Sequence, residues 1–252
     1  MKKVFVVFFC VLILLGWGYS RYSVPVLMYH SINYEEGLLY VKPEVFQKHM
    51  EYLKRANFQV ISLDEFLEIM RANKKFPRRT VVITFDDGYR DNFTYAYPVL
   101  KKYNFPAVIF LVTGRIGRDE RYLNWDEVKK MAESKIIDFG GHTRNHIYLP
   151  SIKDEEELWG EIYLCKEDIE KNTGIVVKYF SYPVGGFTDR IKELVKKAGY
   201  SAGLTTNRGY DLRNLKDFYE INRISVRNDN LLKFMVKVSG YYNIFREGKP
   251  PH

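Results

Sequence analysis

The sequence predicts an α/β barrel, in which parallel strands line the centre and helices pack outside them. From residue 21 onward, short apolar stretches rich in β-branched and aromatic residues alternate with stretches of helical periodicity. The candidate functional residues follow strands, which is where such a barrel gathers its site. The length of 252 residues suits one domain of this kind. A doubly wound open sheet is the alternative, and the barrel is favoured because side chains from several strands must converge on one point.

The first half of the chain follows this alternation closely. Strands are predicted at 24–29, 58–61, 80–85 and 107–112, and helices at 43–56, 62–70 and 92–103. Pro43 is well placed at the start of the first helix. Ser62 and Glu65 have the spacing of a capping box. Pro98 lies inside the third helix and is expected to kink it.

The second half repeats the pattern. Strands are predicted at 136–139, 179–182, 201–205 and 221–226, and helices at 124–134, 154–173, 188–198 and 229–239. Asn124 and Glu127 form a second capping box pattern. Gly174 and Gly199 are expected to stop their helices, and Asp229 is expected to cap the last one.

The composition is that of a folded globular protein, with 46% hydrophobic and 28% charged residues. The formal net charge is +8, and the basic residues are scattered among acids apart from the pairs at 74–75 and 78–79. Without a larger basic cluster, we do not expect a nucleic-acid partner. The charge favours attraction to an anionic wall or membrane surface instead.

Residues 1–20 differ from the rest of the chain. Lys2 and Lys3 precede an apolar run over 4–15, which is the pattern of an export signal. The segment is predicted to be a signal peptide or, if uncleaved, an N-terminal membrane anchor. The main domain is therefore expected to be exported, and to be periplasmic, at the cell surface or membrane-anchored outside the cytoplasm. The predicted division is a signal or anchor at 1–20, one domain at 21–240 and a C-terminal tail at 241–252.

Two adjacent carboxylates end the strand at 80–85. Asp86 and Asp87 would normally point to opposite faces, but Gly88 allows the chain to turn so that both approach one centre. Two like charges at such a short distance repel each other unless a cation or a shared proton offsets them. The pair therefore indicates a metal site whose other ligands come from elsewhere in the chain.

Two of the five histidines provide those ligands. His142 and His146 follow another short apolar stretch, and their i, i+4 spacing predicts that both imidazoles lie on one face of a helical turn. Together with Asp87 they make three protein ligands. Three ligands leave a position open for water, which is typical of a catalytic rather than a structural zinc site.

These motifs resemble those of the polysaccharide deacetylase family, the NodB-type carbohydrate esterases. Residues 84–88 read Thr-Phe-Asp-Asp-Gly, the family's first motif, and residues 142–146 fit its second, His-(Ser/Thr)-x-x-His. Residues 180–185 resemble the third, where the family commonly has Arg-x-Pro-Tyr-Gly. Residues 24–30 resemble the branch that deacetylates exported surface polysaccharides. The resemblance covers about 24–239, nearly the whole mature chain.

The resemblance implies a distorted (β/α)7-type barrel and a metal-dependent hydrolase. By this resemblance Asp87, His142 and His146 bind one divalent ion, zinc before cobalt, nickel or manganese. Asp86 would be the general base. The chemistry agrees, because a bound metal lowers the pKa of its water towards about 7 and a carboxylate beside that water can take its proton.

The third motif is implied to form the substrate loop at Tyr182, Pro183 and Val184. The resemblance points to the backbone N–H of Val184 as a donor to the oxyanion that forms during hydrolysis. Ser181 departs from the pattern, because many relatives have an arginine there that orients the base. Asp86 is therefore expected to be held in another way.

The family's late Leu-x-His motif, which supplies a general acid, is also absent. After His146 the next histidine is His252, at the tail. His30 ends the first predicted strand, at the same rim as Asp86, and is our candidate for the acid. A structural histidine hydrogen-bonded to a metal ligand is the alternative reading of His30.

The leading functional hypothesis is removal of N-acetyl groups from a polysaccharide that contains N-acetylglucosamine. One alternative is an O-acetyl esterase or a deacylase acting on a lipid-linked sugar. Another is a glycan-binding relative without turnover, suggested by the missing acid. Asp86 argues against the last alternative, because a binding protein has no need of a base.

Overall fold

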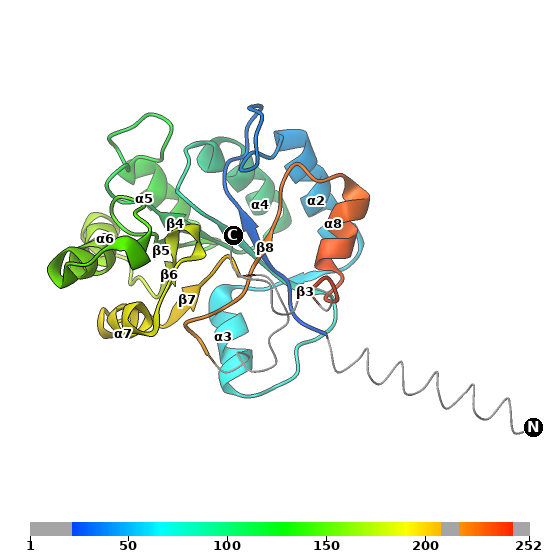
Figure 1. Cartoon of the computed structure of the whole chain (residues 1–252). Coiled ribbons are helices and arrows are strands. Elements are labelled where there is room, and N and C mark those ends of the chain that lie inside the picture. Colours follow the sequence, from blue (N-terminus) through cyan, green and yellow to red (C-terminus); the bar gives the residue numbers. More distant parts are fainter. Residues whose placement is uncertain (1–21, 208–216, 244–252) are drawn as a thin grey trace, which may run out of the picture.

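A curled sheet of parallel strands forms the centre of the protein in the computed structural model, which describes residues 22–207 and 217–243 (Figure 1). The strand order is β7-β6-β5-β4-β3-β1-β8, and β2 pairs with β3 off this path. The strands are β1 (Val26–Tyr29), β2 (Gln59–Val60), β3 (Thr80–Phe85), β4 (Ala107–Leu111), β5 (Ile137–Gly141), β6 (Tyr179–Ser181), β7 (Ala202–Leu204) and β8 (Ile224–Ser225). The α/β barrel predicted from the sequence is confirmed in this distorted form.

Helices cover the outside of the curled sheet (Figure 1). They are α2 (Pro43–Arg55), α3 (Leu63–Arg71), α4 (Tyr97–Tyr103), α5 (Trp125–Glu133), α6 (Glu155–Thr173), α7 (Asp189–Lys197) and α8 (Leu231–Val238), with short 3-10 turns at Leu149–Ser151 and Pro183–Gly185. The capping box at Asn124 and Glu127 is present in full. Ser62 also accepts a hydrogen bond from the backbone N–H of Glu65, so the predicted helix starts are confirmed there.

The alternation of side chains along the strands divides the core in two. Outward residues such as Ile83 and Phe85 of β3 belong to the large cluster under the helices. Inward residues such as Val82 and Phe110 form a smaller cluster inside the sheet, and α3 covers one end of this cluster with Leu67. Because side chains alternate with a period of two, the residue after Phe85 continues the inward face.

The segment from Ile221 to Ser225 bridges the two ends of the sheet. Ile221 makes a parallel bridge to Leu204 at the end of β7. Three residues later, Ile224 pairs with Leu27 of β1. The chain thus passes from one edge to the other, and Arg223 lies on the crossing with its side chain fully buried.

Two predicted elements differ in detail from the structure. The helix expected over 92–103 begins as a π-helix at Asn92–Ala96 and becomes α-helical only at Tyr97, so Pro98 starts α4 instead of kinking it. The last helix is capped by Asn230, which accepts from the N–H of Lys233. Asp229, the predicted cap, is instead buried in ion pairs.

The predicted signal or anchor at 1–20 and most of the tail at 241–252 lie outside the described residues. Within 22–207 and 217–243, no helix has both the length and the apolar character needed to cross a membrane.

Candidate active site

The turn after β3 brings two carboxylates to the carboxyl rim of the sheet. Asp86 continues the inward face of β3 behind Val82 and Thr84. Asp87 and Gly88 then both adopt positive φ, 73° and 74°. The φ of Gly88 is one that L side chains rarely adopt, and a Cβ there would also press on the end of the Leu111 side chain at 2.8 Å. The turn predicted from the sequence is present.

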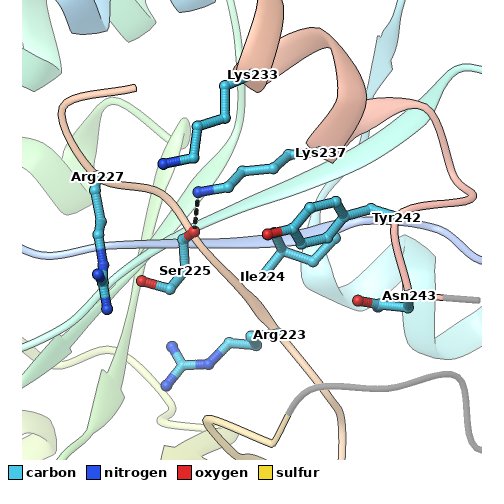
Figure 2. A pocket seen from close by; sticks show the side chains of 8 residues that line it. All are labelled: Arg223, Ile224, Ser225, Arg227, Lys233, Lys237, Tyr242 and Asn243. Carbon is cyan, nitrogen blue, oxygen red and sulfur yellow. Dashed lines mark hydrogen bonds between the residues drawn. The ribbon is translucent and has the colours of Figure 1, made fainter. Parts of the chain in front are cut away.

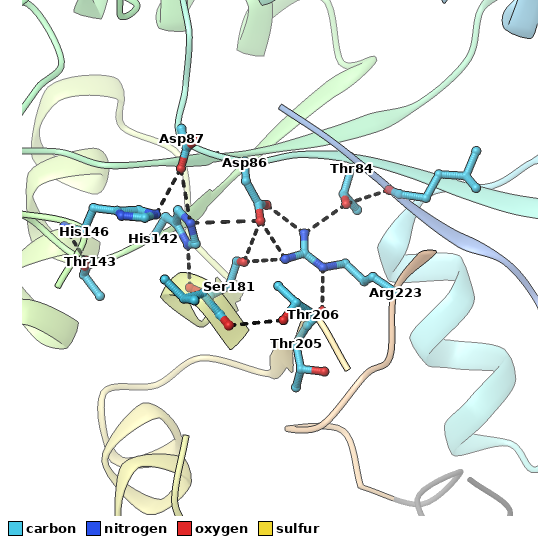
Figure 3. A network of polar contacts seen from close by, with 12 residues as sticks. Thr84, Asp86, Asp87, His142, Thr143, His146, Ser181, Thr205, Thr206 and Arg223 are labelled. Carbon is cyan, nitrogen blue, oxygen red and sulfur yellow. Dashed lines mark hydrogen bonds and ion pairs between the residues drawn. The ribbon is translucent and has the colours of Figure 1, made fainter. Parts of the chain in front are cut away.

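Asp87 lies between the two imidazoles of the second motif (Figure 3). Its Oδ1 is 3.4 Å from Nε2 of His142 and 3.2 Å from Nε2 of His146. The prediction of a helical turn for the histidines is wrong: they lie on an irregular loop after β5, with φ of 62° at Thr143 and 60° at His146. The loop brings the two rings to a centroid distance of 4.9 Å without a helix.

The loop is held by a buried carboxylate of α6. Glu161 accepts hydrogen bonds from the backbone N–H groups of Arg144 and Asn145, at 3.0 and 2.9 Å. The N–H of His146 donates to the hydroxyl of Thr143. These bonds replace the hydrogen bonds that a helix would have supplied. Glu161 therefore positions the two histidines, although it follows them by at least 15 residues in the sequence. The sequence analysis did not identify this role of Glu161.

His142 is oriented by the strand next to it. Its Nδ1–H donates to the backbone carbonyl of Ser181 at 2.7 Å, since a carbonyl can only accept. Nε2, the ring nitrogen that faces Asp87, is thereby left as the nitrogen that can bind a metal ion when the imidazole is neutral. Burial alone would raise the pKa of Asp87, but the imidazoles of His142 and His146 hold that pKa well below its usual range, so the carboxylate is ionised.

The cluster fits a divalent metal ion. Oδ1 of Asp87 is buried and accepts no hydrogen bond from the described residues, although a buried acceptor needs a partner. Ligand atoms of Asp87, His142 and His146 all lie within 4.8 Å of one another. Two tetrahedral ligands at zinc distances of about 2.0–2.1 Å lie about 3.3 Å apart. The two distances from Asp87 Oδ1 to the imidazoles bracket this value.

Asp86 is held by Arg223, which the sequence analysis missed (Figure 3). The guanidinium donates to both carboxylate oxygens of Asp86 at 2.7 Å. It also donates to the hydroxyls of Ser181 and Thr84 and to the carbonyl of Thr205. Arg223 is fully buried, so this bidentate pair is shielded from water.

Arg223 explains the departure at Ser181. Relatives are expected to have an arginine at the position of Ser181. Here the hydroxyl of Ser181 accepts a hydrogen bond from the guanidinium of Arg223, which belongs to the segment that crosses from β7 to β1. Burial alone would raise the pKa of Asp86, but Arg223 and His142 lower it below its ordinary value. Asp86 is therefore ionised and oriented, as a proton acceptor must be.

His30 and Val184 line the same cavity as the carboxylates and the two imidazoles, with a volume of about 290 Å³. Burial lowers the pKa of His30, while the charges of Asp86 and Asp87 oppose that effect. Val184 is half-exposed and has a φ of 56°, which is unusual for a β-branched residue and is typical of functional sites. Tyr182, in contrast, is buried and donates its hydroxyl to a backbone carbonyl, and it is not among the residues that line the cavity.

A smaller cavity of about 140 Å³ lies behind Arg223 (Figure 2). Lys237 of α8 reaches this cavity and donates to the carbonyl of Ser225 at 2.7 Å. Its ammonium also pairs with the buried carboxylate of Asp229. These contacts attach α8 to the segment that carries Arg223, and they give Asp229 a bracing role in place of the predicted cap.

Comparison with known proteins shows the family to which the chain belongs. A model of the family described as polysaccharide deacetylase matches residues 73–203, which include the strand end at Asp87 and both histidines. The chain belongs to the polysaccharide deacetylase family. The polysaccharide deacetylases are hydrolases, and the sequence-based family assignment is confirmed.

Individual relatives share most of their length with this deacetylase. YxkH of Bacillus subtilis, whose name assigns it to the same family, is 34% identical over 81% of this chain and 71% of its own. A poly-beta-1,6-N-acetyl-D-glucosamine N-deacetylase of Staphylococcus aureus is 27% identical over 89% of this chain and 86% of its own. The structure of the deacetylase PplD of Streptococcus pyogenes, in complex with acetate, has a TM-score of 0.77 at 25% identity and covers 86% of this chain and 97% of PplD.

Proposed function

We propose that this enzyme removes N-acetyl groups from an N-acetylglucosamine polysaccharide outside the cytoplasm. It uses one divalent metal ion, for which zinc is the leading candidate. The main support for the proposal is that a possible metal site and a candidate general base line one cavity. Asp87 and the two histidines offer a metal site, and Asp86 lies beside them in a bidentate pair with Arg223. The name of the Staphylococcus aureus relative supports the substrate class, and the apolar segment at 1–20 supports export.

In this proposal each side chain has one task. Asp87, His142 and His146 hold the ion, which supplies a Lewis acid and water of lowered pKa. Asp86 accepts a proton from the water that attacks the acetamide carbon, and Arg223 fixes the orientation of the carboxylate. The backbone N–H of Val184 donates to the oxyanion in this proposal.

His30 completes the proton path in this proposal. The carbon–nitrogen bond breaks as the amine leaves, and the nitrogen needs a proton. Because burial keeps the resting imidazole neutral, His30 must first gain a proton, and the protonated Asp86 in the same cavity is the source. The proton thus passes from water to Asp86, to His30 and to the amine, while acetate is released.

Substitution of His30 tests this path. His30→Ala is expected to lower kcat by about 10²-fold, the usual effect of losing a proton donor, and to leave the metal content unchanged. Elemental analysis and acetate release are measured on the same sample. If added metal restores the activity of the variant, then His30 supports a metal ligand and the donor is another group.

Acetate release from a panel of polymers tests the function itself. The panel contains poly-β-1,6-N-acetylglucosamine, chitin oligomers, peptidoglycan and acetylxylan. We expect release from the β-1,6-linked polymer, accompanied by free amines in equal number. Release from acetylxylan alone would identify an O-acetyl esterase, and binding of a polymer without release would identify a glycan-binding protein.

A further inference from the structure

The cavity of about 140 Å³ behind Arg223 has a lining of one sign of charge (Figure 2). Lys233 and Lys237 reach it from α8, and Arg223 and Arg227 reach it from the two ends of β8. No carboxylate is among the lining residues in the described part of the chain. The charge of Arg223 is offset by its pair with Asp86, so the other three cations decide the charge of the cavity.

One nearby carboxylate serves these three cations. Asp229 pairs with the ammonium groups of both Lys233, at 2.7 Å, and Lys237. Its hydrogen bond with Arg227 uses the backbone N–H of Arg227, at 3.2 Å, and not the guanidinium. The three cations therefore exceed the carboxylate by two positive charges.

The pKa of Lys237 agrees with a shortage of negative charge. Burial lowers this pKa below its ordinary value, and the ion pair with Asp229 opposes the effect without cancelling it. The charges of Lys233 and Arg227 lower the pKa further. A bound anion would favour the charged ammonium and so offset these lowering effects.

Asn243 adds a buried hydrogen-bond donor to the lining. The residue is 8% exposed, and its side chain makes no hydrogen bond within 22–207 and 217–243. Buried polar groups normally have a hydrogen-bond partner. The side-chain amide can donate to an anionic oxygen, which neither the lysines nor the arginines of the lining can supply.

The volume of the cavity restricts the ligand to a few atoms. A cavity of about 150 Å³ can hold a molecule of the size of benzene. Phosphate and acetate are small enough for 140 Å³, whereas a sugar ring with its substituents is too large. An excess of two positive charges favours a doubly charged ion over a singly charged one.

We propose that this cavity is a binding site for a small oxyanion of the phosphate type. The ammonium groups of Lys233 and Lys237, the guanidinium of Arg227 and the amide of Asn243 provide its donors. The site goes beyond the proposed function, because the anion takes no part in the hydrolysis. A bound anion links α8 to the segment that carries Arg223, and it stabilises the folded enzyme by binding to that state alone.

Calorimetric titration of the metal-loaded enzyme tests the ligand class. The probes are inorganic phosphate, glycerol 3-phosphate and acetate. We expect phosphate to bind with a Kd of about 1 mM or lower, and acetate to bind at least about tenfold more weakly because it has a single charge. The tighter of the two phosphates identifies the source, which is the free ion or a phosphate ester.

Asn243→Asp tests the charge of the cavity. A new buried carboxylate ordinarily destabilises a protein. Here it should offset the excess positive charge, so the Tm in phosphate-free buffer should rise by about 2–4 °C. The variant should also lose phosphate binding at this cavity. Asn124→Asp is the matched control, because it makes the same change of charge at the N-cap of α5, where the two residues cap equally well.

Lys233→Met is a second variant, which removes one cation with little effect on packing. The side chain of Lys233 is 59% exposed, and Asp229 keeps its pair with Lys237. Phosphate should bind this variant about tenfold more weakly. Phosphate that binds at the metal ion is recognised because neither Lys233→Met nor Asn243→Asp changes it.

Four results would overturn the oxyanion site. The first is the absence of phosphate binding that depends on Asn243, at concentrations up to about 50 mM. The second is an Asn243→Asp variant with a lowered Tm and the phosphate affinity of the Asn124→Asp control. The third is an unchanged affinity in Lys233→Met. The fourth is acetate that binds more tightly than either phosphate.

Discussion

Asp86→Asn is expected to reduce turnover by about 10²–10⁴-fold, which is the usual contribution of a general base. The amide has nearly the shape of the carboxylate, but its nitrogen cannot accept a hydrogen bond, so Arg223 keeps one of the two acceptors that Asp86 offers. It cannot accept the proton of the attacking water. Because Asp86 is not one of the three clustered ligands, metal content should stay at the level of the unmodified enzyme.

Asp87→Asn is the matched variant, since it makes the same change one residue away. Asp87 gives the cluster its negative charge and a buried oxygen that accepts no hydrogen bond within the described part of the chain. The variant should therefore lose metal as well as activity. Elemental analysis of both variants separates the two roles. Loss of metal in Asp86→Asn with full occupancy in Asp87→Asn would reverse the assignments.

Arg223→Met is expected to affect both stability and the pH dependence of the reaction. The substitution leaves the carboxylate of Asp86 buried without its charge partner, at a cost of about 3–5 kcal/mol in the free energy of unfolding. Thermal or urea unfolding measures this loss. Arg227→Met is the control, because Arg227 lines the 290 Å³ cavity of the candidate site and the 140 Å³ cavity beside Arg223 but is not among the hydrogen-bond donors to Asp86.

The direction of the pH effect follows from the cause of the pKa shift. Arg223 lowers the pKa of Asp86 against the opposing effect of burial. The base is therefore ionised down to a pH below the ordinary aspartate value, and activity is lost as the pH falls through that lowered pKa. Without Arg223, burial raises the pKa, so the acidic limb of the kcat profile should move to higher pH. An unchanged acidic limb in a folded Arg223→Met enzyme would show that Arg223 does not tune the base.

The sequence predicted those parts of the site that adjacent residues encode. Asp86 and Asp87 are consecutive, and Gly88 marks the turn that brings them together. His142 and His146 are four residues apart and follow a strand. Residues this close along the chain stay near one another in many backbone conformations, so Asp87, His142 and His146 lie together even though the histidines are on a loop and not on a helix.

The contacts that hold these residues were not predictable from spacing. Arg223 meets Asp86 across 137 positions of the chain, and the pair depends on a segment that crosses from β7 to β1. Glu161 holds the histidine loop from a helix. The sequence around Arg223 resembles an ordinary short strand, and its one signal was indirect: Ser181 occupied a position where an arginine was expected.

The same limit explains the cap at the last helix. Asp229 and Asn230 are both good cap residues, and local propensity does not separate them. The buried ion pair with Lys237 decides the outcome. Asn230 then accepts the hydrogen bond at the helix start.

Stoichiometric restoration of activity by metal tests the central claim most directly. The purified chain is stripped with a chelator and titrated with zinc while acetate release from poly-β-1,6-N-acetylglucosamine is followed. We predict that activity is absent without metal and reaches its maximum at one zinc per chain, and that His142→Ala gives no such titration because it lacks one of the three ligands. Full activity in the metal-free chain, or an unchanged titration in His142→Ala, would contradict this account.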